Sequence, residues 1–209
     1  KNLVGAFHQP KLVLCDLDVL HTLPSREFRA GIAEVIKYGI IYDAKLFARL
    51  ERDLPKILAY DLITLTSVIA RCCQIKAEVV GKDEREGGLR AILNFGHTIG
   101  HGLEAISSYG KYLHGEAISI GQVAAARLSK QCTGLTAKDA ARMVSLFDKA
   151  GLPTQIKLTA LKTKQLFAAM QLDKKVSGGK IKFVLAKRIG QVVSGQIVAP
   201  AIIRQSLKQ

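Results

Sequence analysis

The sequence has no tryptophan, few aromatic residues, four cysteines and no long uninterrupted hydrophobic run. No apolar run reaches the roughly 18 residues of a membrane-spanning helix, and residues 1–5 do not open a signal peptide. The cysteines form no CxxC pair, so we expect buried free thiols in a reducing compartment rather than a disulfide framework. These absences predict a soluble, cytoplasmic protein with no membrane contact.

The chain has an excess of positive charge, with a formal net charge of +14. Lysines and arginines are spread along the whole length and are not interleaved with aromatic residues, as they are in proteins that bind single-stranded nucleic acid. The charge therefore favours a phosphorylated or carboxylated small molecule as partner, and we expect no nucleic acid. A merely lysine-rich surface is the simpler alternative.

Hydrophobic periodicity predicts a mainly helical protein in one domain, residues 1–209, because there is no internal repeat or linker. The run 11–15 reads as a short buried strand, and Ser25 is a plausible N-cap for the helix that follows. A small β-hairpin is expected near the C-terminal end, from strands at 181–186 and 191–193. Further helices are expected at 43–54, 55–80, 93–106, 116–132, 136–149, 159–170 and 198–207.

Three histidines are concentrated in the glycine-rich stretch 86–116. His97 and His101 are four residues apart and share a helix face, and His114 precedes a second apolar-periodic run. Glu34 and Lys37 share a face of an earlier helix, where apolar and small neighbours indicate that the pair is largely buried. Glu34, His97 and His114 together form the carboxylate and imidazole ligand set of a catalytic zinc with an open position.

Side chains that can donate hydrogen bonds to anionic groups occur close to these candidate ligands in the sequence. His101, one helical turn beyond His97, is suited to proton transfer rather than metal binding. The charged turn 82–86 comes immediately before the donors Arg90 and Asn94, which favours a functional loop over a solvated turn. The other donors expected to bind carboxylate and phosphate groups are Lys37, Lys76 and one of Lys174 and Lys175.

Several of these segments closely resemble the 3-dehydroquinate synthase family. The resemblance extends from residue 1 to about residue 180 and rests on long motifs: KNLVGAFHQP (1–10), AEVIKYG (33–39), KAEVV (76–80), DERE (83–86), LR (89–90), LNFGHTIGH (93–101) and LHGE (113–116). It implies the helical C-terminal, metal-binding domain of that enzyme, with residues 1–24 as the junction to an N-terminal α/β domain.

The resemblance also implies roles for individual residues. The metal, Zn²⁺ or Co²⁺, would be bound by Glu34, His97 and His114. Catalytic positions would fall on Lys37, Glu86 and His101, and substrate-binding positions on Asn2, Lys76, Arg90, Asn94, Lys174 and Lys175. Positions near the NAD⁺ cofactor would be Lys1, Val19, Leu20, His21 and Thr22.

The implied reaction belongs to the shikimate pathway of aromatic amino acid biosynthesis. NAD⁺ oxidises the C5 hydroxyl of 3-deoxy-D-arabino-heptulosonate 7-phosphate, phosphate is eliminated, the C5 ketone is reduced again, and an aldol step closes the ring to 3-dehydroquinate. The family further implies a homodimer of the full-length enzyme.

The main departure from the family is that the chain has no glycine-rich strand–loop–helix for a dinucleotide. We therefore expect the NAD-binding domain to be absent from this chain, and the chain alone to be inactive. Two alternatives remain: another sugar-phosphate cyclase that uses NAD and a metal, and a non-catalytic basic helical module whose histidines are structural. The pair Arg90 and Asn94, with LNFGHTIGH, favours the dehydroquinate enzyme.

Overall fold

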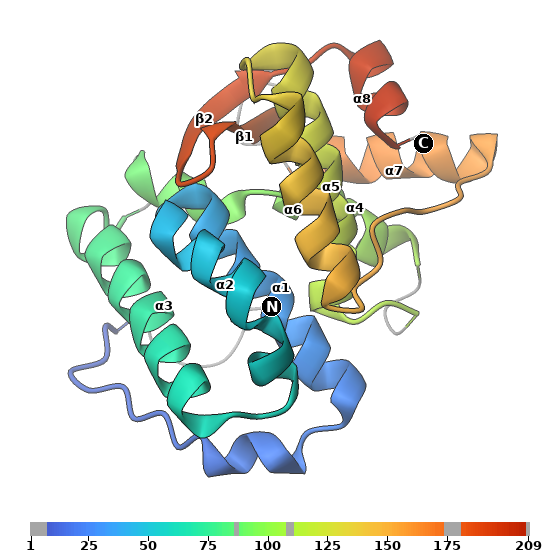
Figure 1. The fold of residues 1–209 in the computed structure, drawn as a ribbon. Helices are drawn as coiled ribbons and strands as arrows, with labels where there is room; N and C mark the ends of the chain where they lie inside the picture. Colours follow the sequence, from blue (N-terminus) through green and yellow to red (C-terminus); the bar gives the residue numbers. More distant parts are fainter. Residues whose placement is uncertain (1–7, 86–87, 108–110, 174–180, 208–209) are drawn as a thin grey trace.

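The structure is a computed structural model that describes residues 8–85, 88–107, 111–173 and 181–207. It confirms the predicted fold, a multi-helix domain with one small antiparallel hairpin (Figure 1). The elements are η1 (Asp18–Thr22), α1 (Ser25–Ile41), α2 (Ala44–Leu58), α3 (Leu62–Lys82), η2 (Leu89–Asn94), α4 (His97–Ile106), α5 (His114–Cys132), α6 (Ala137–Lys149), α7 (Ala160–Asp173), β1 (Lys182–Arg188), β2 (Gln191–Ile197) and α8 (Pro200–Leu207).

Helix α5 is the central element, and it contacts α1, α4, α6, α8 and β1. In Figure 1 it runs through the middle of the molecule, with α1–α3 at the lower left and the hairpin, α7 and α8 across the top. Its glycines and alanines let neighbouring backbones approach closely. A Cβ on Gly115 would overlap the backbone of Ala30 on α1, and one on Gly121 would overlap that of Gly96 before α4.

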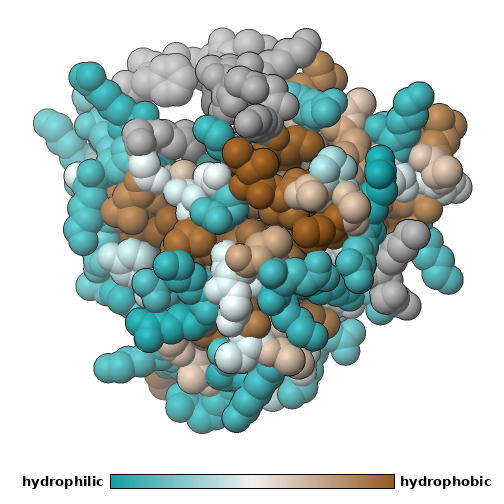
Figure 2. All heavy atoms as spheres, turned by 90° about the horizontal axis from the view of Figure 1, so that it is seen from above, coloured by the Kyte–Doolittle hydropathy of each residue, from teal (hydrophilic) through white to brown (hydrophobic). Residues whose placement is uncertain are grey.

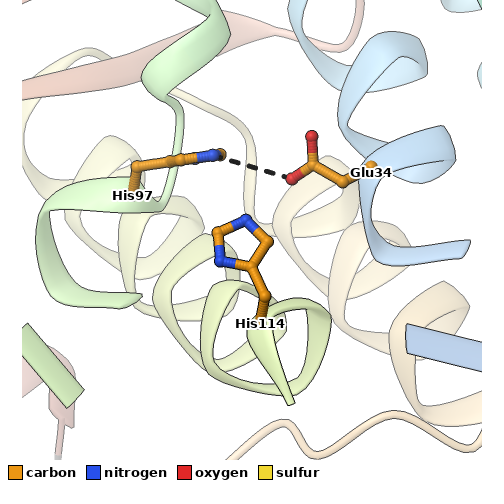
Figure 3. A group of neighbouring side chains, drawn as sticks. All are labelled: Glu34, His97 and His114. Atoms are coloured by element: carbon orange, nitrogen blue, oxygen red, sulfur yellow. Dashed lines mark ion pairs between the residues drawn. The ribbon is translucent and has the colours of Figure 1, made fainter. Parts of the chain in front are cut away.

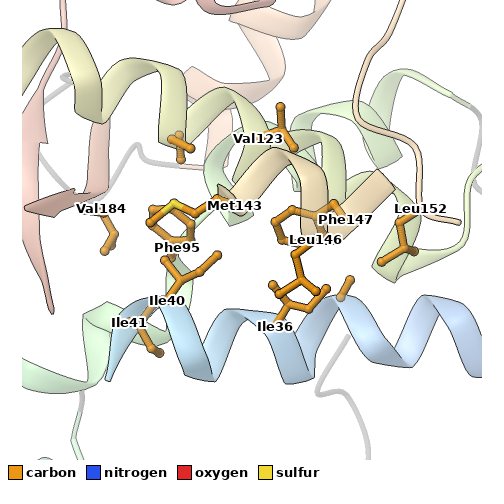
Figure 4. Close-up of a cluster of buried hydrophobic side chains, with 14 of the residues drawn as sticks. Ile36, Ile40, Ile41, Phe95, Val123, Met143, Leu146, Phe147, Leu152 and Val184 are labelled. Carbon is orange, nitrogen blue, oxygen red and sulfur yellow. The ribbon is translucent and has the colours of Figure 1, made fainter. Parts of the chain in front are cut away.

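The hydrophobic core lies between α1 and the elements packed around α5 (Figure 4). Ile36 and Ile40 of α1 are fully buried and face Phe95, Met143 and Phe147 in the close-up. Because α1 and α5 share this core, their positions relative to each other are set by close packing rather than by surface contacts.

Side-chain caps define several of the helix starts. Asp43 accepts hydrogen bonds from the backbone N–H groups of Lys45 and Leu46, and Thr136 caps α6 by accepting from the N–H of Asp139, at the start of the helix predicted over 136–149. The prediction that Pro55 opens a long helix is wrong, because Pro55 lies inside α2 and the next helix begins after the Asp61 cap. Ser25 is the first residue of α1 rather than its cap.

The predicted buried strand at residues 11–15 is also wrong. The segment has no strand partner among the residues that the structure describes, and Leu12 and Leu14 are 82% and 86% exposed. A strand needs a neighbour to pair with its backbone, and within the described residues the sheet consists of β1 and β2.

The cysteines were expected to be buried free thiols. Only Cys72 is buried, since Cys15, Cys73 and Cys132 are exposed.

The predicted histidine helix is divided in two. Gly96 adopts a left-handed conformation (φ +80°) between the 3-10 turn η2 and α4, so the helix proper starts at His97. Helix α5 likewise starts at His114, two residues before the predicted boundary. Both imidazoles therefore stand at helix N-termini, next to chain turns.

The end of the molecule that carries the hairpin and α8 has hydrophobic side chains near the middle of its surface, with hydrophilic ones to the left and below in Figure 2. Ile197 at the end of β2 is 61% exposed.

Among the described residues, no helix combines the length and the apolar character needed to cross a membrane.

Candidate metal centre

Three side chains from distant parts of the sequence converge at one point (Figure 3). Glu34 is contributed by the middle of α1, His97 by the start of α4 and His114 by the start of α5. One ligand atom from each residue lies within 4.8 Å of the other two. The structure thus brings together the three residues that the sequence predicts as metal ligands.

His97 is held in a defined orientation by its own turn. Its Nδ1 lies 3.1 Å from the backbone carbonyl oxygen of Phe95, which can only accept a hydrogen bond. The ring proton is therefore assigned to Nδ1, which leaves the lone pair of Nε2 facing Glu34 Oε1 at 3.7 Å. The left-handed Gly96 between Phe95 and His97 permits this tight geometry.

The electrostatic environment keeps His97 neutral. Burial, reinforced by the nearby Lys37 ammonium, lowers the pKa of His97 from 6.5 to about 4. A neutral imidazole is the form that binds a metal ion. His97 is consequently in its ligand form at neutral pH without having to lose a proton.

Glu34 has one oxygen engaged and one available. Lys37 Nζ donates to Glu34 Oε2 at 2.5 Å, in agreement with the pair predicted on one face of this helix. Lys37 itself is only 3% exposed. Burial alone would raise the pKa of the Glu34 carboxyl, but Lys37 and His97 outweigh it and hold that pKa below its ordinary value. Among the described residues, the buried Oε1 has no hydrogen-bond partner.

His114 repeats the pattern of His97 with a different partner. Its Nδ1 lies 3.0 Å from Glu104 Oε1 on α4. Figure 3 shows the other ring nitrogen directed into the space between His97 and Glu34. All three predicted ligands therefore keep one atom in an orienting contact and present another to a shared point.

This donor set suits a borderline metal ion. One carboxylate and two imidazoles are the protein ligands of many catalytic zinc sites, which retain an open position for substrate. A buried carboxylate oxygen without a hydrogen-bond partner is costly unless a cation neutralises it, and Glu34 Oε1 is such an atom as far as the described residues extend. The residues present thus fit Zn²⁺ or Co²⁺.

A second candidate set overlaps the first. His101, Glu104 and His114 also place one ligand atom each within 4.8 Å of the others. The ring centroid of His101 lies 5.2 Å from that of His97 and 6.0 Å from that of His114. His101 thus borders the group formed by Glu34, His97 and His114.

The remaining predicted residues are only partly brought together. Asn94 and Arg90 lie on η2, directly before the Gly96 turn, and Lys76 is exposed on α3. Arg90 is anchored through its side chain to the carbonyl of Glu84 and through its backbone N–H to Asp83. Other predicted site residues lie outside the described part of the chain: Lys1, Asn2, Glu86, Lys174 and Lys175.

The predicted cofactor residues form the 3-10 turn η1. Val19, His21 and Thr22 are exposed, and Leu20 is partly buried. His21 stacks on Tyr60, with ring centroids 5.0 Å apart, and Thr22 donates to the Val19 carbonyl. No hydrogen bond or ring contact found within the described ranges connects η1 to the three ligands.

Two residues at the centre are missing from the sequence-based prediction. Glu104 follows His97 and His101 at the spacing of one helix face, a signal that could have identified it. Gln122 on α5 is fully buried, and its Nε2 donates to the Ala33 carbonyl at 3.0 Å. A polar residue in an alanine-rich helix gives no comparable signal, because its partner is a distant backbone atom.

Comparison with known sequences identifies the family. Residues 31–176 match the family model "3-dehydroquinate synthase C-terminal", and residues 1–30 match "3-dehydroquinate synthase N-terminal". Over the whole chain, it is 52% identical to the 3-dehydroquinate synthase of Nostoc punctiforme and 48% identical to that of Neisseria gonorrhoeae. The chain spans 58% and 57% of the lengths of these relatives.

Two solved structures of synthases share the fold of this chain. A 2-epi-5-epi-valiolone synthase from Streptomyces hygroscopicus, with NAD⁺ and Zn²⁺ bound, is 27% identical and superposes with a TM-score of 0.88 over 99% of this chain and 57% of its own. A 2-deoxy-scyllo-inosose synthase complexed with carbaglucose-6-phosphate, NAD⁺ and Co²⁺ is also 27% identical, with a TM-score of 0.83 over 100% of this chain and 59% of its own. The match of residues 31–176 to the family model, together with relatives about half identical over the whole chain, shows that this chain belongs to the 3-dehydroquinate synthase family.

Proposed function

We propose that this chain supplies the metal and substrate site of a 3-dehydroquinate synthase, which converts 3-deoxy-D-arabino-heptulosonate 7-phosphate to 3-dehydroquinate and phosphate. The observation that carries the proposal is the convergence of Glu34, His97 and His114, each oriented by its own second contact. Relatives of that name at about half identity over the whole chain support it.

Glu34, His97 and His114 would hold the metal, with NAD⁺ bound chiefly by an N-terminal domain and by residues 19–22. When bound, these groups supply polarisation of the C5 oxygen and hydride exchange at C5. Lys37 keeps the Glu34 carboxylate charged and in place. His101, beside the two ligand imidazoles, is the residue that takes or returns a proton at the substrate.

Cationic and amide donors would fix the substrate in position. Arg90 and Asn94 stand on the turn before His97, where their donors suit the carboxylate of the sugar acid. Lys76 and one of Lys174 and Lys175 are proposed for the remaining oxygens and the phosphate. We further propose a cytoplasmic enzyme that functions as a homodimer, with this chain joined to its NAD-binding domain.

The main alternative is a related cyclase that makes an aminocyclitol precursor. It is favoured by the names of the solved structures, which share the fold at 27% identity. The higher identity to the dehydroquinate synthases and the close spacing of Arg90, Asn94 and His97 favour the dehydroquinate enzyme. The two candidate enzymes differ in the sugar phosphate that they consume.

Phosphate release tests the proposal. The chain would be fused behind the N-terminal part of the Nostoc punctiforme relative and assayed with Zn²⁺, NAD⁺ and either the heptulosonate 7-phosphate or glucose 6-phosphate, whose carba analogue is bound in the inosose synthase. We expect phosphate release only from the heptulosonate, and no release by the 209-residue chain alone. Turnover of glucose 6-phosphate instead would favour the alternative cyclase, and turnover by the lone chain would disprove the expected need for a second domain.

A further inference from the structure

Building on the proposed metal site, we propose that Glu104 is a positioning residue that fixes the ring proton of His114 on Nδ1 and so directs the lone pair of Nε2 to the metal. The contact that carries this inference is the 3.0 Å approach of Glu104 Oε1 to His114 Nδ1. An ionised carboxylate can only accept a hydrogen bond, so the shared proton belongs to the imidazole.

The two ligand histidines differ in how firmly the fold itself holds them. The side chain of His97 is 13% exposed, whereas that of His114 is 46% exposed. Packing and the Phe95 carbonyl orient His97, but packing cannot fix a half-exposed ring. Glu104, whose side chain is only 21% exposed, supplies the missing constraint from the next helix.

Glu104 also adds a charge that the Phe95 carbonyl lacks. A carboxylate behind a ligand imidazole strengthens its hydrogen bond and makes the opposite nitrogen a better donor to a metal ion. The centre would therefore gain electron density through His114 while Glu104 itself stays out of contact with the ion.

The competing role for Glu104 is that of a direct ligand, in the set of His101, Glu104 and His114. An ion there would draw Glu104 away from its contact with the His114 N–H. It would also leave Glu34 Oε1 buried without a partner among the described residues. The orientation of Glu34 and His97 toward the first site therefore favours the positioning role.

Zinc affinity and the tautomer of His114 test the proposal in the 209-residue chain. Glu104→Ala should weaken zinc binding by about 10–100-fold, the usual effect of losing such a partner. Glu104→Gln, which keeps an accepting oxygen, should recover most of the affinity. Glu27→Ala, at an exposed carboxylate on α1, is the matched control and should bind zinc as the wild type does.

The second readout is nitrogen NMR of the metal-free chain, at a pH above the ordinary imidazole pKa of about 6.5. His114 should show the Nδ1–H tautomer in the wild type and in Glu104→Gln, and a shift toward Nε2–H in Glu104→Ala. If Glu104→Ala does not fold, Glu104→Asp removes the same contact with a smaller change of volume.

An unchanged tautomer after the contact is removed would overturn the proposal. So would equal loss of affinity in Glu104→Gln and Glu104→Ala with an altered Co²⁺ absorption spectrum, because that pattern identifies a direct ligand. A wild-type chain that binds no zinc would refute the proposed metal site instead, and the NMR measurement would still decide the role of Glu104.

Discussion

The side-chain amide of Gln122 on α5 donates to the backbone carbonyl of Ala33, the residue before Glu34 on α1. The same side chain lies against Gly96, the residue before His97, because a Cβ on that glycine would come within 2.6 Å of the Gln122 backbone nitrogen and closer still to its Cγ. Gln122 therefore fixes the distance between the two backbone segments that carry Glu34 and His97.

Replacement of Gln122 should separate its packing from its hydrogen bond. Gln122→Ala opens a cavity in the core, and we expect the free energy of unfolding to fall by about 2–4 kcal/mol. Gln122→Met keeps the volume and also removes Oε1, which has no hydrogen-bond partner in the described part of the chain, so its cost should stay below about 1.5 kcal/mol. Urea denaturation measures both, and equal losses would show that the amide itself is required.

Two glycines should respond to alanine in opposite directions. Gly115→Ala places a Cβ against the Ala30 backbone, 2.8 Å from its Cα, and should destabilise the fold by about 1–3 kcal/mol. Gly31→Ala on α1 meets nothing within 4 Å and should stabilise by up to about 1 kcal/mol, because glycine is a poor helix former. Thermal melting of the two variants side by side tests this, and a stable Gly115→Ala would contradict the close approach of α5 to α1.

The metal site itself predicts one zinc ion for each chain. His97→Ala and Glu34→Gln should each abolish stoichiometric binding, because each removes a ligand or its charge from the set. Metal content after dialysis measures the result, with His21→Ala on η1 as a histidine control outside the cluster. Full zinc retention in His97→Ala would exclude His97 as a ligand.

Acid stability should depend in part on Asp43. Burial alone would raise the pKa of its carboxyl, but the N–H of Leu46 and the Arg71 guanidinium, 2.7 Å away, hold that pKa below its ordinary value. A carboxyl with a lowered folded-state pKa stabilises the fold above its unfolded pKa of about 3.9, and this contribution is lost as the pH falls through the folded value.

Asp43→Asn removes the ion pair but keeps a cap acceptor for α2. We expect a loss of about 1 kcal/mol at pH 7 that shrinks as the pH approaches 3. Guanidinium denaturation across this range provides the measurement. A loss independent of pH would show that the charge of Asp43 has no part in stability.

Local signals in the sequence were sufficient for most helices, and the three side chains predicted as metal ligands are ones that the structure brings together. Asp43 and Thr136 mark helix starts through side chains that reach their own backbone, and such contacts can be read from spacing. Pro55 was misread because a proline inside a helix and one at its first turn look alike until Asp61 is recognised as the cap. The run at 11–15 has strand-like residues, but strand formation depends on a partner that spacing does not reveal.

The hydrogen bonds that hold the centre in place were not predictable where they join two different elements. His97 and His101 are related by helical spacing, whereas the contacts of His114 with Glu104 and of Gln122 with Ala33 join different helices. The break at Gly96 also escaped prediction, since a glycine in an apolar run is compatible with a continuous helix until its left-handed conformation is seen.

Glu34 and His97 are separated by 63 positions in the sequence (97 − 34), and His114 starts yet another helix. An ion held by all three is therefore a cross-link between the first long helix and the pair formed by α4 and α5. Complete unfolding has to release that ion, so an ion at 100 times its dissociation constant would add about 2.7 kcal/mol to the free energy of unfolding. The concentration of free metal would then contribute directly to the stability of this helical domain.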